Sequence, residues 1–228
     1  MIGSVATGLA VAAVAAHGTW HRNSWVFGPV LTRLPEAGTV ASITFDDGPN
    51  PVATPRILDA LKANGVLATF FVLGRHADRW PELVKRMADE GHQLGNHGYQ
   101  HRKLHRQLPG YVRDDLTRGA DAIERAAGVR PAVFRAPHGF RNPWVTPIAR
   151  ALGERTIGWS LGVWDSARPG VDEIVRRTLD GMRAGSILLL HDGDGYDAAG
   201  DRTQTAEALP RIIEGLRERG FRFVTLPN

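Results

Sequence analysis

From residue 39 onward, short apolar runs alternate with stretches in which apolar residues recur every three or four positions. The first pattern is typical of buried strands and the second of amphipathic helices. Strands are therefore expected over residues 39–46, 66–74, 92–97, 132–137, 155–161, 186–191 and 222–226, and helices over residues 53–65, 76–91, 110–128, 143–153, 171–182 and 205–220.

Local signals support several of the expected helix ends. The helix over 53–65 should have Thr54 as its N-cap, Pro55 at its first position and Gly65 at its end. Gly91 and Gly128 should likewise close the helices over 76–91 and 110–128.

About seven strand–helix units with short connections predict a mainly parallel sheet covered by helices. The expected fold class is α/β, an irregular (β/α)7-type barrel formed as a single domain over residues 39–228. Residues 1–38 are expected to be an apolar N-terminal segment and a connector. In such folds the chemistry lies at the C-terminal ends of the strands.

The first sixteen residues, "MIGSVATGLAVAAVAA", carry no charge. They are too short to cross a bilayer unless the segment continues through Trp20. A basic start is missing, but Val14-Ala15-Ala16 resembles a cleavage site. A signal peptide, a membrane anchor and an ordinary apolar helix all fit. We expect membrane association through residues 2–20 and an exported or anchored protein of the cell envelope, or a cytoplasmic one if residues 1–20 are not a targeting segment.

Composition removes several classes of function. The chain has no cysteine, which excludes disulfides, thiolate zinc sites and cysteine nucleophiles. Its net charge of +4 is spread along the chain without a basic block, so nucleic acid is not an expected partner. No G-x-S-x-G occurs, which argues against a serine hydrolase. We expect a monomer.

Ionisable residues stand at the ends of five predicted strands. The first strand ends in Asp46-Asp47, the third runs into His97 with His101 four residues later, and the others lead to Arg135, Asp165 and His191. Parallel strands would bring all of these residues to one face of the molecule.

His97 and His101 have the i, i+4 spacing that places two imidazoles on one side of a helical turn. Alone, such a pair is more often solvated or part of a core. With Asp47 it forms a two-histidine, one-carboxylate set, which suits Zn²⁺ with an open position, or non-haem Fe²⁺. Asp46 would then remain free to take a proton from a bound water. The alternative is that both acids merely start a turn with Gly48-Pro49.

Three further residues can complete such a site. His191 follows four apolar residues and lies where a general acid is needed. Arg135 can orient Asp46 and hold it ionised, and Asp165 can raise the pKa of His191.

Five motifs resemble those of the NodB-homology polysaccharide deacetylases, carbohydrate esterase family 4, over about residues 39–227. "TFDDGP" at Thr44–Pro49 is the most specific of them, and "NHGYQH", "RAPHG", "WSLGVWD" and "LLLHD" are similar to the four others. The resemblance implies Asp46 as catalytic base and His191 as general acid, supported by Arg135 and Asp165. It also implies Asp47, His97 and His101 as ligands of Zn²⁺ or another divalent metal such as Co²⁺ or Ni²⁺.

The resemblance further implies that the backbone N–H of His138 stabilises the oxyanion. It places the substrate groove at Pro137, Gly139, Phe140, Trp164 and Leu189. Four positions depart from the family pattern. Gly98 replaces a Ser or Thr whose hydroxyl braces the metal loop, His138 replaces a Tyr, and Gly162 and Ser166 stand where Asp and Trp are frequent. Trp164 can fill the apolar wall instead.

The resulting expectation is a metal-dependent hydrolase that removes acetyl groups from N-acetylated sugars of a chitin- or peptidoglycan-type glycan. Three alternatives remain: a deformylase or deacetylase of a lipid-linked amino sugar or small amide, a metal-free carbohydrate-binding protein, and an Fe²⁺ oxygenase. The Asp- and Gly-rich residues 191–201 lack an EF-hand pattern and are expected to be a flexible loop bordering the site. His76, His92 and His105 are expected to be structural, and Trp20, Trp25, Trp80 and Trp144 to be packing groups unless they reach the mouth of the site.

Overall fold

The computed structural model describes residues 2–35 and 38–227. Its helices are α1 (Ile2–Trp20), α2 (Ala53–Ala63), α3 (Gly74–Arg79), α4 (Pro81–Asp89), α5 (Pro109–Ala127), α6 (Val145–Ala151), α7 (Val171–Gly181) and α8 (Thr203–Glu218), with 3₁₀ turns η1 (Leu104–Arg106), η2 (Pro137–Gly139) and η3 (Asp165–Ala167). Its strands are β1 (Val40–Asp46), β2 (Thr69–Val72), β3 (Gln93–Asn96), β4 (Val133–Phe134), β5 (Arg155–Thr156), β6 (Leu161–Gly162), β7 (Ser186–His191) and β8 (Arg222–Phe223).

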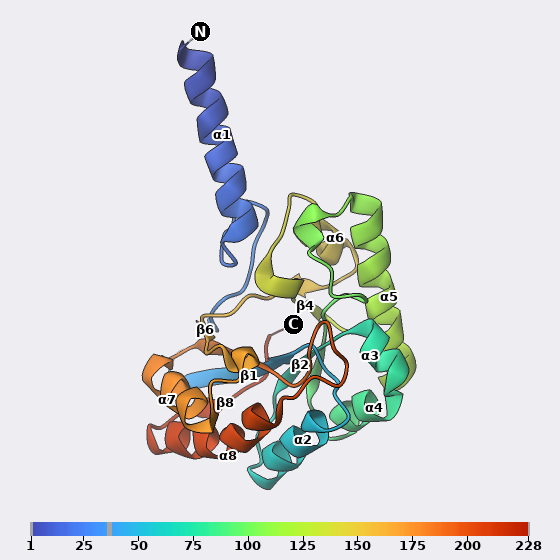
Figure 1. Cartoon of the computed structure of the whole chain (residues 1–228), viewed down its shortest axis with the longest axis vertical. Coiled ribbons are helices and arrows are strands. Elements are labelled where there is room, and N and C mark those ends of the chain that lie inside the picture. The colour runs from blue at the N-terminus through green and yellow to red at the C-terminus, as the bar shows by residue number, and fades with distance from the viewer. Residues whose placement is uncertain (1, 36–37, 228) are drawn as a thin grey trace.

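The strands of the described residues form one eight-stranded sheet in the order β5-β4-β3-β2-β1-β7-β6, with β8 paired to the start of β1. Every strand pair is parallel. Helices α2, α3, α4, α5, α7 and α8 surround the sheet, while α1 projects away from the body (Figure 1). The expected irregular (β/α)7-type barrel is confirmed.

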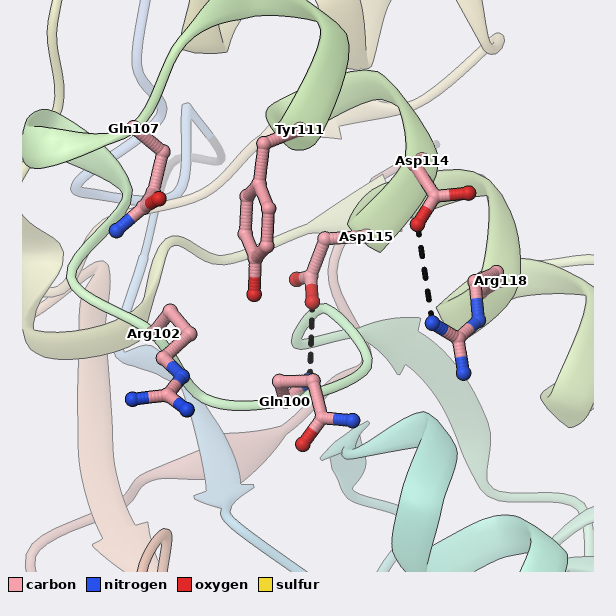
Figure 2. A pocket seen from close by; sticks show the side chains of 7 residues that line it. All are labelled: Gln100, Arg102, Gln107, Tyr111, Asp114, Asp115 and Arg118. Carbon is pink, nitrogen blue, oxygen red and sulfur yellow. Dashed lines mark hydrogen bonds and ion pairs between the residues drawn. The ribbon is translucent and has the colours of Figure 1, made fainter.

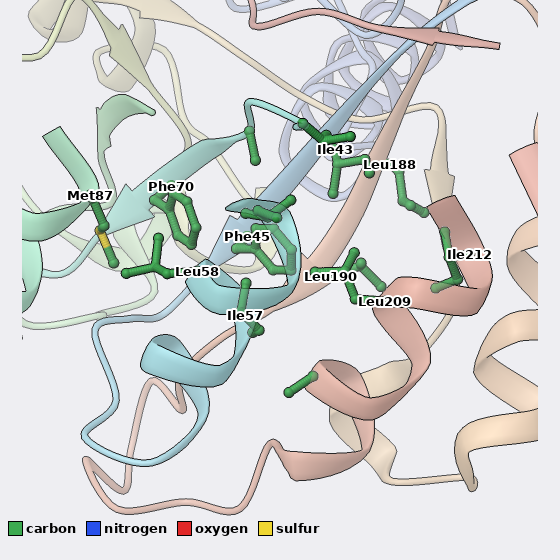
Figure 3. Packing of buried hydrophobic residues seen from close by; sticks show 14 of the residues in the cluster. Ile43, Phe45, Ile57, Leu58, Phe70, Met87, Leu188, Leu190, Leu209 and Ile212 are labelled. Carbon is green, nitrogen blue, oxygen red and sulfur yellow. The ribbon is translucent and has the colours of Figure 1, made fainter. Parts of the chain in front are cut away.

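Alternation along the strands separates the core from the site. In β1, Ile43 and Phe45 point to the helices and join the main apolar cluster with Leu188 and Leu190 of β7 (Figure 3). The intervening residues of β1 are Ser42, Thr44 and Asp46, so one face of the strand is polar although all of it is buried. The polar face of β1 therefore carries groups that need partners inside the barrel.

Three predicted element boundaries are wrong. Thr54 does not cap α2; the side-chain oxygen of Asn50 accepts hydrogen bonds from the N–H groups of Val52 and Ala53 instead. The single helix expected over 76–91 is two helices, because Pro81 lacks an N–H and starts α4, leaving Trp80 outside helical geometry.

The third wrong boundary concerns residues 155–161, where one strand was expected and β5 and β6 are found. β5 pairs with β4, whereas β6 pairs with β7 at the opposite edge of the sheet. The chain between them crosses the gap that remains open in the barrel. Leu31 and Arg33 of the N-terminal connector fill the same gap through bridges to Ile157 and Ser186.

Helix α1 is exposed along residues 7–16. Nowhere in the described chain is a helix both long and apolar enough to cross a membrane.

Candidate active site

The C-terminal ends of the strands bring the predicted ionisable residues together. Asp46 lies opposite His191 in the β1–β7 register, and His97 and Arg135 directly follow β3 and β4. Asp46, Asp47 and His101 line one cavity of about 540 Å³ together with Asp165 and His191.

Asp47, His97 and His101 form a compact buried cluster. Oδ1 of Asp47 lies 3.3 Å from Nε2 of His97 and 3.1 Å from Nε2 of His101. Among the described residues this is the only group of three or more potential ligands close enough to share one ion, with ligand atoms within 4.8 Å of one another. Burial disfavours ionisation of Asp47, but the two imidazoles outweigh it and hold its pKa well below the ordinary value. Two imidazoles and an ionised carboxylate fit Zn²⁺ and related divalent metals.

The segment between the two histidines is not a helical turn, contrary to the expectation from their spacing. Residues 97–103 are irregular, with Gly98 at φ 77° and His101 at φ 56° in the left-handed region. The imidazoles converge through this tight loop rather than through helix periodicity.

Two hydrogen bonds to backbone carbonyl oxygens hold His97 and Asp47 in place. Nδ1 of His97 lies 2.8 Å from the carbonyl oxygen of Arg135. A proton on Nδ1 leaves the lone pair of Nε2 facing Asp47, as a metal ligand requires. Nδ1 of His76 lies 2.9 Å from the carbonyl oxygen of Asp47. Burial, the largest influence, lowers the pKa of His76 to about 4, so the ring is neutral. His76, expected to be merely structural, thus supports Asp47, which has a left-handed φ of 74°.

Asp46 is held by a buried arginine. Nη1 of Arg135 donates to Oδ1 of Asp46 at 2.7 Å and to the hydroxyl of Thr44 at 2.8 Å, and Nη2 donates to the carbonyl of Gly158 at 2.9 Å. The other oxygen of Asp46 lies 3.8 Å from Nε2 of His97. The predicted arrangement of Arg135 beside Asp46 is present in the structure, with one carboxylate oxygen left facing the cluster.

His191, the neighbour of Asp46 at the end of β7, is paired with Asp165. Nδ1 of His191 lies 2.9 Å from Oδ1 of Asp165, whose Oδ2 accepts hydrogen bonds from the His191 N–H and the Thr205 hydroxyl. Burial alone would lower the pKa of His191, but Asp165 and the two other nearby acids raise it from 6.5 to about 9. This ring is therefore protonated at neutral pH, and its side chain is 17% exposed.

Aromatic side chains surround the mouth of the cavity. Phe140, Trp164 and Leu189 line it as expected, whereas Pro137 and Gly139 are buried and do not. A Cβ on Gly139 would lie 2.7 Å from Trp159 and 3.0 Å from Arg22, so this glycine lets the wall pack closely. His138, with φ 61°, exchanges a hydrogen bond of 2.8 Å with the hydroxyl of Tyr196.

The end of α1 and the connector that follows it also contribute to the wall; the sequence analysis allowed Trp20 to reach the mouth of the site but did not single out Arg22. Trp20 and Arg22 line the cavity; Trp20 contacts the rings of His105 and Phe140, and Arg22 lies over Trp159. Buried Arg141 fixes this connector by donating to the carbonyl of Ser24 at 2.6 Å. No periodicity or motif near residue 20 indicates such a role.

The Asp- and Gly-rich loop borders the cavity, as predicted. Arg202 donates to the carbonyl of Gly193 and to Asp194, and Arg75 donates to the carbonyl of Gly195. Asp194 also caps the N–H groups of Tyr196 and Asp197. Asp194 is thus used in the turn of its own loop.

The barrel brings a two-histidine, one-aspartate cluster together with a second acid and a protonated histidine. This arrangement is typical of metal-dependent hydrolases. The chain matches the family model described as polysaccharide deacetylase over residues 34–157. A chitooligosaccharide deacetylase of Bradyrhizobium sp. (strain ANU 289) is 42% identical over 193 residues, which cover 82% of this chain and 88% of that protein.

Two solved structures share the fold. A peptidoglycan N-acetylglucosamine deacetylase in complex with 4-naphthalen-1-yl-N-oxidanyl-benzamide gives a TM-score of 0.82 at 34% identity, covering 87% of this chain and 91% of that one. A CE4 family pseudoenzyme of Bacillus anthracis gives 0.79 at 28% identity, covering 86% of this chain and 66% of that one. The chain belongs to the polysaccharide deacetylase family of hydrolases.

Proposed function

We propose that this protein is a divalent-metal-dependent deacetylase of N-acetylated glycans, with Asp46 as base and His191 as acid. The observation that carries the proposal is that the Asp47, His97 and His101 cluster lies at one cavity with a carboxylate held by Arg135 and an imidazole held by Asp165. One family relative is a pseudoenzyme, so membership alone is a weaker argument than this arrangement.

Asp47, His97 and His101 would hold the metal, and Zn²⁺, Co²⁺ and Ni²⁺ all suit the donor set. A cation bound there would polarise the acetyl carbonyl and lower the pKa of a bound water. The backbone N–H of His138 is our proposed second donor to the developing oxyanion.

The two remaining groups would move the protons. The oxygen of Asp46 that faces the cluster accepts the proton of the attacking water, while Arg135 keeps the carboxylate in place. His191 carries a proton at neutral pH and donates it to the leaving amine of the sugar. The bond broken is the amide C–N bond, and the products are acetate and a free amine.

The shape of the cavity supports a sugar substrate. Trp164 and Tyr196 are 73% and 69% exposed, and Trp20 is 54% exposed, at the rim of a cavity whose floor carries the ionisable groups. Exposed rings at the mouth suit stacking against pyranose faces. The relatives named for chitooligosaccharide and for peptidoglycan N-acetylglucosamine make these two glycans the first substrates to test.

The test is acetate release by the metal-free protein, with and without added Zn²⁺ or Co²⁺, from chitooligosaccharides, peptidoglycan fragments and acetylated xylan. We expect release from at least one N-acetylated glycan, loss of activity with a chelator and recovery with metal. Acetate release from none of them, by protein that binds the metal, would overturn the proposed reaction. Glycan binding without metal binding would favour the metal-free carbohydrate-binding alternative.

We also propose that α1 directs the enzyme to a membrane surface in the cell envelope. Residues 7–16 of this helix are exposed and the first charged residue of the chain is Arg22. Co-sedimentation with lipid vesicles tests this proposal. The full chain should sediment with them, whereas a variant with Asp at positions Leu9 and Val14 should stay in the supernatant, and equal sedimentation of the two would contradict it.

A further inference from the structure

The loop that carries the two histidines is packed backbone-to-backbone between α3 and α5. A Cβ on Gly119 of α5 would lie 2.4 Å from Oδ1 of Asn96 and 2.9 Å from the carbonyl carbon of Gly98. A Cβ on Gly74 of α3 would lie 2.8 Å from Cα of Gly119. The N–H of Gly74 also donates to the carbonyl of Gly98 at 2.9 Å. The three glycines allow both helices to touch the loop.

Asp115 reaches this loop from the same face of α5, one helical turn before Gly119. Its Oδ2 accepts a hydrogen bond from the N–H of Tyr99 and its Oδ1 one from the N–H of Gln100, each at 3.1 Å. Figure 2 shows the carboxylate of Asp115 directed at the backbone beside Gln100. Both N–H groups belong to residues between the two histidines.

Among the described residues, Asp115 makes no other side-chain hydrogen bond and no ion pair. It is 3% exposed, and no Lys or Arg of the described residues forms an ion pair with it. Arg118, three residues further along the helix, acts on Asp115 only at longer range, because its guanidinium lies over the ring of Tyr99 and 3.7 Å from Asp114. A buried carboxylate without a directly paired cation is unfavourable unless hydrogen bonds offset the cost of its burial, and here the two loop N–H groups supply them.

The loop needs such a partner because it is not helical. Its left-handed residues at positions 98 and 101 prevent the Tyr99 and Gln100 N–H groups from joining a helical ladder. Asp115 satisfies both, and it does so where Gly98 has no side chain. A Cβ on Gly98 would lie 2.5 Å from Oδ2 of Asp115, so the carboxylate can take this place only because position 98 has no side chain.

We propose that Asp115 is a positioning residue for metal binding, which holds residues 98–101 in the shape that brings His101 to Asp47. This inference rests on the proposed metal-dependent function. The Asp115 carboxylate of α5 makes the stabilising hydrogen bonds to the loop that the missing side chain at position 98 cannot make. Residues that orient metal ligands typically contribute 10–100-fold to metal affinity.

The experiment is a titration of the metal-free full-length protein with Co²⁺ alone, followed by visible absorbance. Asp115→Asn should weaken Co²⁺ binding about 10- to 100-fold, because the amide offers one acceptor and turns its NH₂ towards the second N–H. At saturating metal the turnover number should return to within a few-fold of the wild-type value. Asp114→Asn, which removes the same charge from an exposed neighbour on α5, should leave Co²⁺ affinity unchanged.

A second pair of variants tests the contact between Gly98 and Asp115 from the loop side, and circular dichroism shows beforehand that each variant is folded. Gly98→Ser should weaken Co²⁺ binding more in the wild-type background than in the Asp115→Ala background, because removing the carboxylate makes room for the new Cβ. Backbone strain at position 98 is the same in both backgrounds, so the difference reports the contact itself. Wild-type Co²⁺ affinity in Asp115→Asn, or equal effects of Gly98→Ser in the two backgrounds, would overturn the inference. Failure of the wild-type protein to bind Co²⁺ would instead overturn the proposed function.

Discussion

Asp46 and Asp47 are adjacent in the chain, yet their surroundings give them different chemistry. Side chains of consecutive strand residues normally point to opposite faces. Here Asp47 adopts φ 74°, and both carboxylates come within 3.8 Å of Nε2 of His97. Arg135 occupies one oxygen of Asp46, while the histidines surround Asp47. One left-handed residue therefore places a ligand and a base side by side.

Replacing Asp46 with Asn tests the proposed base. Turnover should fall by about 10²- to 10⁴-fold, the usual contribution of a general base. Bound metal should stay the same because Asp47 and both histidines are untouched. The loss of a carboxylate beside buried Arg135 should also lower the melting temperature, so the assay temperature must be well below it. Full activity in the Asn variant would remove Asp46 from the mechanism.

Asp165→Asn tests the pairing with His191 through the pH profile. The active form of His191 is protonated, and its pKa is raised to about 9 mainly by Asp165 against the effect of burial. Activity should therefore persist below that value and fall as the pH rises through it. In the Asn variant this alkaline limit should move towards the ordinary histidine value of 6.5.

The measurement for Asp165→Asn is kcat/KM between about pH 5 and pH 10. Thr205→Val is the matched control, since it removes a hydrogen bond to Asp165 but keeps the charge. It should shift the limit much less. An unchanged alkaline limit in the Asn variant would show that Asp165 does not set the protonation of His191.

At the scale of elements, much of the architecture and most of the site could be predicted because both follow local rules. Alternation of apolar runs with amphipathic stretches predicted the barrel, and the acids and histidines were visible because they follow buried strands. The exceptions are non-local. The sequence near residue 155 does not show that the chain pairs first with β4, through β5, and then with β7, through β6. The sequence near Asp115, His76 or Trp20 does not show which distant backbone or cavity each side chain reaches.

Gly119 gives a test at the level of α5. Glycine inside a helix normally costs about 1 kcal/mol relative to alanine, so Gly119→Ala would stabilise an isolated helix. In this protein the new Cβ would lie 2.9 Å from the carbonyl carbon of Gly98, in the loop between the two histidines. Overpacking should make the variant about 1–3 kcal/mol less stable, as measured by denaturant unfolding.

Gly110→Ala is the matched control for Gly119→Ala. Position 110 lies in the same helix, and a Cβ there would have nothing within 4 Å. This variant should be neutral or slightly more stable than the wild type. Equal stability changes at the two positions would mean that helix propensity, and not contact with the loop, decides the effect at Gly119.

At the scale of the whole molecule, the end of α1, the connector that follows it and the barrel together line one cavity. The family model begins at residue 34, but Trp20 and Arg22 line the cavity before that point. The connector also fills the gap in the barrel through Leu31 and Arg33. Residues upstream of the matched region should therefore affect the KM for those substrates that are long enough to reach the rim of the cavity.

Trp20→Ala tests this wall. An aromatic contact is worth about 0.5–1.5 kcal/mol, so KM for an N-acetylated oligosaccharide should rise about 2- to 12-fold with kcat nearly unchanged, since the ring is at the rim and not at the reacting atoms. A short substrate that does not reach the rim should show no change. Trp25→Ala is the control, because Trp25 is 71% exposed but does not line the cavity. If both variants behave alike towards long and short substrates, the connector has no part in substrate binding and the groove is built by the barrel alone.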